Sequence, residues 1–191
     1  MTDLLDIVQY VKPTALMGLS TVRGAFSEAV IRRMASQTPR PIVFPLSNPS
    51  QLSECTFAEA LRASGGSVLF ASGSPFPTEN FGGRKWEPGQ GNNMYIFPGL
   101  GLGSILCRAS SVTDSMVEAS AIGLTNSLSW DERALELIYP RIERIREISA
   151  HIAVRVIRTA QAAVSCLSFP IGTRKLIIIS RMLIVHQTSG N

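Results

Sequence analysis

The chain has 191 residues, of which 45% are hydrophobic and 17% are charged, and its formal net charge is +4. This composition excludes a disordered protein, because enough apolar surface is available to offset the entropy lost on ordering, and the length suits one domain with or without an appendage. The positive residues are scattered rather than clustered with aromatic residues, so the basic charge does not indicate nucleic-acid binding.

Cysteine usage and hydropathy exclude two further classes of protein. Cys55, Cys107 and Cys166 are far apart and form no C-x-x-C pair, which indicates a reducing compartment without a disulfide framework or a zinc site. The most apolar stretch, 176–185, is interrupted by Arg181 and is shorter than the roughly 20 residues that span a bilayer. We therefore expect no membrane association.

Short apolar runs alternate with helical patterns in the first part of the chain. We predict strands over 14–19, 41–46 and 67–71, and helices over 25–35 and 57–63. Thr56 and Glu59 have the T-x-x-E spacing of a capping box at the start of the second helix. A strand–helix–strand alternation predicts a parallel sheet covered by helices.

The rest of the chain is predicted to be a loop followed by helices. Residues 72–92 are rich in glycine and proline, which is typical of a lid or a ligand-contacting loop. Helices are predicted over 93–108, after a Ser111–Asp114 cap, and from Pro140 to Ala163, with an apolar stripe at Ile142, Ile145, Ile148, Ile152 and Val156. Gly99, Gly101 and Gly103 do not form a phosphate-binding turn, and we interpret them as allowing close helix packing.

Small polar residues follow each of the three predicted strands. They are Ser20 and Thr21, then 47–50 (Ser-Asn-Pro-Ser), then 72–76 (Ser-Gly-Ser-Pro-Phe). Ligands of an open α/β sheet bind at the carboxyl ends of its strands, so these loops are expected to converge on one crevice. The Asn48 amide fits a hydroxy-carboxylate or carboxamide ligand, but an asparagine before a proline equally fits a turn cap.

Asn92 and Asn93 form a second amide cluster, at the start of the predicted 93–108 helix. Helix starts favour anions, so these residues are candidates for ligand binding, and an N-cap role fits them equally well. No acidic cluster with metal-ligand spacing is evident, because Glu54, Asp114, Asp131 and Glu132 are interpreted as solitary or as lying on helical surfaces.

Four segments in this order resemble the malic enzymes. The segments are 12–20 (KPTALMGLS), 40–50 (RPIVFPLSNPS) with Glu-Cys-Thr at 54–56, 70–76 (FASGSPF) and 88–99 (PGQGNNMYIFPG). The resemblance covers roughly residues 3–163. It implies an α/β fold, namely the second half of a Rossmann-like dinucleotide-binding domain with a partial parallel sheet, followed by C-terminal helices.

The resemblance also implies site residues. Asn48, Asn92 and Asn93 match residues near malate, and Ser20, Ser47, Asn48, Ser72 and Gly73 match the wall of the nucleotide crevice. The family's tyrosine and lysine acid–base pair, malate-binding arginine, three acidic metal ligands and Gly-rich turn are all expected to precede this segment. We therefore predict no catalytic residue and no metal ligand within this chain.

The resemblance implies oxidative decarboxylation of malate to pyruvate and CO₂ with NAD or NADP and with Mg²⁺ or Mn²⁺. The alternative is an inactive fragment that serves only in nucleotide binding or oligomerisation. We predict a nucleotide-binding portion over 1–163 and a divergent tail of unknown role over 164–191. A homo-oligomer is expected for a full-length form, in the cytoplasm or the mitochondrial matrix.

Overall fold

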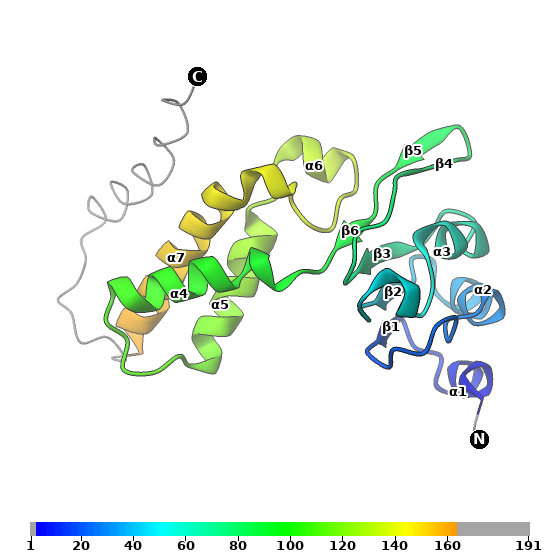
Figure 1. Cartoon of the computed structure of the whole chain (residues 1–191), viewed down its shortest axis with the longest axis horizontal. Coiled ribbons are helices and arrows are strands. Elements are labelled where there is room, and N and C mark those ends of the chain that lie inside the picture. Colours follow the sequence, from blue (N-terminus) through cyan, green and yellow to red (C-terminus); the bar gives the residue numbers. More distant parts are fainter. Residues whose placement is uncertain (1–2, 164–191) are drawn as a thin grey trace. The chain divides into compact units, whose positions relative to one another are not determined.

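The computed structural model describes residues 3–163, which belong to two compact units (Figure 1). The first unit ends at Asn92 and contains the sheet, whereas the second begins at Asn93 and contains helices. Each unit has its own hydrophobic core.

The first unit is built on a four-stranded parallel sheet with the strand order β1-β2-β3-β6. Its strands are β1 (Ala15–Gly18), β2 (Ile42–Pro45), β3 (Leu69–Ser72) and β6 (Gly89–Gln90). The register aligns Ala15 with Ile42 and Ile42 with Leu69. The three predicted strands and their parallel pairing are confirmed, and each is shorter than predicted by one or two residues.

Three helices pack on this sheet, and a short 3-10 turn precedes the last of them. They are α1 (Leu4–Val11), α2 (Glu28–Gln37) and α3 (Phe57–Ala63), with η1 at Ser50–Leu52. The α3 capping box forms as predicted, because the Thr56 side chain accepts from Glu59 N–H and the Glu59 carboxylate accepts from Thr56 N–H. Asp3 and Ser27 cap the other two helices. The sequence patterns did not predict α1.

The helices cover one face of the sheet and form the core with it (Figure 1). Ile31, Met34, Val43 and Leu61 are at most 1% exposed. Strand β1 lies at the end of the strand order, and Met17 on it is 62% exposed. Within the described part of the chain, β1 is therefore an edge strand and the sheet face that carries Met17 exposes apolar surface, as expected for part of a doubly wound sheet.

The predicted loop over 72–92 contains three strands, so that prediction is wrong there. Besides β6, it holds an antiparallel hairpin of β4 (Glu79–Phe81) and β5 (Arg84–Trp86). Gly82 and Gly83 both have positive φ, at 60° and 74°, which is the conformation of a two-residue hairpin turn. The Trp86 indole N–H donates to the Phe81 carbonyl (3.1 Å).

The second unit packs α4 and α5 against a long helix, α7. Its elements are η2 (Asn93–Tyr95), α4 (Phe97–Leu106), α5 (Asp114–Asn126), α6 (Trp130–Ala134), η3 (Ile142–Arg144) and α7 (Ile145–Ala162). Ile148, Ile152 and Val156 of the predicted stripe are fully buried. A Cβ on Gly99 would lie 2.6 Å from the Ile152 Cβ, and one on Gly103 would lie 2.8 Å from the Val156 Cβ. The interpretation of these glycines as close-packing residues is confirmed at Gly99 and Gly103, but a Cβ on Gly101 would meet nothing.

Three predicted helix starts in this unit differ from the structure. The first is at residue 93, where a 3-10 turn precedes α4. The second is the cap of α5, which is Thr113 rather than Ser111, because the Thr113 side chain accepts from Met116 N–H. The third is Pro140: Arg141 is extended and its N–H donates to Glu132 (2.8 Å), so α7 begins at Ile145 and Ile142 is 37% exposed.

Candidate functional site

The loops that follow β1, β2 and β3 lie at the carboxyl edge of the sheet, because the three strands are parallel neighbours. They contribute Ser20 after β1, then Ser47 and Asn48 after β2, and Gly73 and Ser74 after β3. Ser20 and Asn48 are exposed, whereas Ser47 is buried at 5%. These loops are the candidate nucleotide-facing surface of the first unit.

The Asn48 side chain joins the second loop to the third. The Ser74 hydroxyl donates to Asn48 Oδ1 (2.6 Å), and Asn48 Nδ2 donates to the Leu46 carbonyl (3.4 Å). The peptide bond between Asn48 and Pro49 is cis. These local bonds fit the turn-cap interpretation, and the exposure of the amide fits the ligand interpretation, so both roles are compatible with the geometry.

The third loop packs so closely that it requires glycine at position 73. A Cβ on Gly73 would lie 2.3 Å from the Leu46 carbonyl oxygen and 2.8 Å from Asn48 Nδ2. Ser72 is the last residue of β3 rather than part of a loop, and it is 1% exposed. Its hydroxyl donates to the Ser74 carbonyl (2.8 Å), so within this structure the Ser72 side chain stabilises the loop.

Sequence reasoning missed a buried carboxylate beneath these loops. Glu54 is 0% exposed, and its Oε1 accepts from Ser20 N–H (3.0 Å), the Ser20 hydroxyl (3.1 Å) and the Ser47 hydroxyl (2.5 Å). Burial raises the pKa of Glu54, but the hydrogen bonds from Ser47 and Ser20 lower it by more, so the pKa lies below its usual value. The sequence analysis did not predict that Glu54 is buried, because no local pattern in the sequence signals its burial.

Glu132 in the second unit is also buried, at 2%, so its interpretation as a residue on a helical surface is wrong. Its carboxylate completes the α6 capping box with Ser129 and accepts from Arg141 N–H (2.8 Å) and from the Arg144 guanidinium (2.6 Å). The residues joined are up to twelve positions apart. Glu132 therefore stabilises the connection between α6 and α7.

The two predicted amide residues at 92 and 93 belong to different units. Asn92 ends the first unit and is partly exposed, and its N–H donates to the Gln90 carbonyl (3.2 Å). Asn93 begins the second unit in η2, is exposed, and its carbonyl accepts from Ile96 N–H (3.1 Å). Their roles as malate contacts stay predictions.

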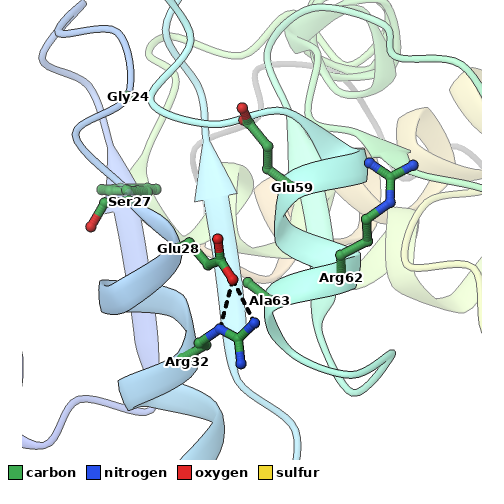
Figure 2. Close-up of a pocket in the computed structure, with 8 residues that line it drawn as sticks. Gly24, Ser27, Glu28, Arg32, Glu59, Arg62 and Ala63 are labelled. Atoms are coloured by element: carbon green, nitrogen blue, oxygen red, sulfur yellow. Dashed lines mark hydrogen bonds and ion pairs between the residues drawn. The ribbon is translucent and has the colours of Figure 1, made fainter.

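A pocket of about 580 Å³ in the first unit lies along α2 and α3 and is lined by none of the predicted site residues (Figure 2). Its four charged side chains already have partners in the chain. Glu28 pairs with Arg32 (2.5 Å), Arg62 pairs with Glu79 (3.3 Å), and Glu59 caps α3. Because none of the predicted residues lines the pocket, we assign the candidate site to the strand-end loops instead.

The described residues fit a nucleotide better than a metal ion. Exposed hydroxyl and amide groups at the strand ends can donate to and accept from a carboxamide or a ribose. Over residues 3–163, no group of three or more His, Cys, Asp or Glu side chains is placed to hold a metal ion. In the same part of the chain, no helix has the length and hydropathy required to cross a membrane.

Comparisons with known proteins agree with this geometry. The family model described as "Malic enzyme, NAD binding domain" matches residues 1–161. The NADP-dependent malic enzyme of Dictyostelium discoideum is 49% identical over 158 residues, which are 83% of this chain and 29% of that protein. The mitochondrial NAD-dependent malic enzyme of Ascaris suum is 45% identical over 155 residues, which are 81% of this chain and 24% of that protein.

A solved structure supports the fold. The Entamoeba histolytica malic enzyme matches with a TM-score of 0.71 at 24% identity, covering 91% of this chain and 32% of that one. The chain thus spans less than a third of the length of the relatives it matches. The predicted family and the predicted partial Rossmann-like fold are both confirmed: the chain belongs to the malic enzymes and corresponds to part of their NAD-binding domain.

Proposed function

We propose that this chain supplies one wall of the NAD(P) crevice of a malic enzyme, together with asparagines that contact malate. The observation that carries the proposal is the linked set of polar loops at the carboxyl ends of β1, β2 and β3. Such a crevice is where open α/β sheets bind dinucleotides. The reaction in which the wall takes part is the oxidative decarboxylation of malate to pyruvate and CO₂.

Each predicted residue has a role in this proposal that suits its chemistry. The Asn48 amide both donates and accepts, so it orients the nicotinamide carboxamide or the hydroxy-carboxylate of malate. Ser20, Ser47, Ser72 and Gly73 shape the wall, in which Ser20 is exposed and the other three are buried. Asn92 and Asn93 add further amides for malate. When bound, NAD(P) supplies the hydride acceptor, and the chain's own contribution is binding and orientation.

Metal-assisted decarboxylation is not assigned to this chain. The acidic residues of the described part do not form a metal-binding group. The chain by itself is therefore proposed to bind nucleotide without turning over malate. The alternative is an inactive fragment that serves only in nucleotide binding or oligomerisation and takes no part in a malic enzyme active site. The position of β1 at the end of the strand order and the exposed Met17 on it support oligomerisation.

Ligand titration followed by amide NMR on the full chain tests the proposal. NAD⁺ and NADP⁺, and then malate, are expected to shift the resonances of Ser20, Asn48 and Ser74, because these residues lie at the strand ends. Asn48→Ala is expected to weaken nucleotide binding, whereas Asn80→Ala, at another exposed asparagine, on the β4–β5 hairpin, is expected to leave it unchanged.

Two further results bear on the same proposal. We expect malate-dependent formation of NAD(P)H by the purified chain to be negligible, and measurable turnover would contradict the assignment of binding alone. Absence of any shift at the strand-end residues with either dinucleotide would overturn the crevice assignment. Sedimentation velocity would then decide whether the chain serves in oligomerisation.

A further inference from the structure

Glu54 lies on the connection between η1 and α3, away from the strand ends in sequence, yet it contacts two strand-end loops. Ser20 is 34 residues before it and Ser47 is seven residues before it. Its own backbone carbonyl accepts from Phe26 N–H (3.1 Å), which fixes the same connection to the segment that leads into α2. One side chain therefore joins the loops that continue beyond Gly18 and Pro45, the last paired residues of β1 and β2.

The hydrogen bonds from Glu54 continue into the adjacent backbone. The Ser47 hydroxyl donates to Glu54 and accepts from Thr21 N–H (2.9 Å). Thr21 has φ 56°, a left-handed conformation that is strained for a β-branched residue and persists where neighbouring groups hold it. The backbone turn after β1 is therefore held at two consecutive N–H groups, Ser20 by Glu54 and Thr21 by Ser47.

The Glu54 carboxylate packs closely against the backbone of Gly18. A Cβ on Gly18 would lie 2.5 Å from the Glu54 carboxyl carbon and 2.7 Å from Oε2. Oε2 is buried and has no hydrogen-bond partner among the described residues. A buried carboxylate with one unsatisfied oxygen is an expensive way to stabilise a fold, since a well-packed apolar side chain avoids the desolvation. A carboxylate at this position instead gives the donors of Ser20 and Ser47 a charged acceptor, which binds them more strongly than a neutral one.

We infer that Glu54 is a positioning residue of the crevice, whose buried carboxylate fixes the Ser20–Thr21 turn against Ser47 and, through the neighbouring Asn48–Ser74 hydrogen bond, orders all three strand-end loops. The inference deepens the proposed function and rests on it for the link to nucleotide. The ordering of the loops themselves is a property of the free chain. It can therefore be measured without any ligand.

The test compares Glu54→Gln with Glu132→Gln in the full chain. Both glutamates are buried and accept several hydrogen bonds, but Glu132 lies in the other unit, so it controls for the loss of a buried carboxylate. Glu54→Gln keeps the size of the side chain and replaces charge-assisted hydrogen bonds by weaker neutral ones. We expect amide hydrogen exchange at Ser20 and Thr21 to accelerate by about tenfold in Glu54→Gln and not in Glu132→Gln.

A spectroscopic signature separates positioning from general stability. The Ser20 amide proton resonance should move upfield in Glu54→Gln as the carboxylate is lost, while the methyl resonances of Val43 and Leu61 in the core stay in place. Ser47→Ala provides a second variant, which should expose Thr21 N–H and leave the Ser20 bond intact. Unchanged exchange and an unchanged Ser20 resonance in Glu54→Gln would overturn the inference.

Nucleotide titration of the same variants distinguishes the two proposals. If the wild-type chain binds NAD(P), Glu54→Gln should weaken that binding by about tenfold and Glu132→Gln should not. Equal affinity of Glu54→Gln and wild type would refute the link to the crevice. If the wild-type chain binds neither dinucleotide, the proposed function fails, and the exchange and resonance measurements still decide whether Glu54 positions the loops.

Discussion

The packing of α4 on α7 predicts opposite effects for alanine at two glycines of the same helix. Gly103 is buried, and a Cβ there would lie 2.8 Å from the Val156 Cβ and 2.9 Å from the Ala153 carbonyl oxygen. Gly101 is exposed, and a Cβ there would meet no atom within 4 Å. Neither glycine has positive φ, so alanine suits the backbone at both positions.

The expected magnitudes follow from two effects. Alanine in place of glycine inside a helix stabilises it by about 1 kcal/mol, and this gain is common to both variants. An added carbon in a well-packed contact costs about 1–3 kcal/mol, and this cost falls on Gly103→Ala alone because a backbone carbonyl cannot move aside as a side chain can. The free energy of unfolding of Gly101→Ala should therefore exceed that of Gly103→Ala by about 1–3 kcal/mol.

Urea unfolding followed by far-ultraviolet circular dichroism measures this difference. Hydrogen exchange of the α7 amides then shows where the stability is lost, since the atoms that the new Cβ meets belong to Ala153 and Val156 of α7. Equal stability of the two variants would show that α4 and α7 are not packed as closely as the structure has them. It would also refute the interpretation of Gly103 as a packing residue.

Two further predictions concern titratable groups. Burial, with added repulsion from Glu59 and Glu54, raises the pKa of the Cys55 thiol to about 12. Iodoacetamide near neutral pH should therefore alkylate Cys55 in urea but not in the folded chain. Peptide mass mapping measures the labelling, and equal labelling of Cys55 in both conditions would contradict this prediction. Burial raises the pKa of Glu132, but hydrogen bonds from Arg141 and Ser129 and the charge of Arg144 lower it by more, so it lies below 4.5. The ionised Glu132 therefore stabilises the folded chain fully above pH 4.5, and this contribution is lost as the pH falls through the lowered pKa. Glu132→Gln should weaken the acid dependence of the urea midpoint, and an unchanged dependence would refute this role.

Helices and strands were predictable where the periodicity of apolar residues agrees with the residues that begin and end the element. The predicted helix over 57–63 has the bounds of α3, because Thr56 and Glu59 fix its start and Gly65 follows its end. The strands were found because each is a short apolar run followed by polar residues. The hairpin of β4 and β5 was missed because its strands are three residues long and partly or fully exposed, so they carry no apolar pattern.

The candidate site was predictable in its location and not in its interior. The sequence predicted that Ser20, Ser47 and Asn48 lie at one edge of the sheet because the carboxyl ends of parallel strands meet there, and their contacts with a ligand stay predictions. Glu54 was missed because its hydrogen-bond partners lie as many as 34 residues away, and a single acidic residue has no periodic signal of burial. The predicted start of α7 was wrong for a related reason: the Arg141 N–H donates to the distant Glu132, and Arg141 stays outside the helix.

The two buried glutamates perform related tasks with different consequences. A carboxylate offers several acceptor sites, so it can join donors from separate segments where no regular element supplies partners. Glu132 uses both oxygens, with Arg141 on Oε1 and with Ser129 and Arg144 on Oε2, so its bonds offset the cost of burial and it stabilises its unit. Glu54 concentrates its bonds on Oε1 and leaves Oε2 without a described partner, so less of its burial is offset. Loss of Glu132 should therefore lower the stability of the second unit, whereas loss of Glu54 should chiefly disorder the loops at the carboxyl ends of β1, β2 and β3.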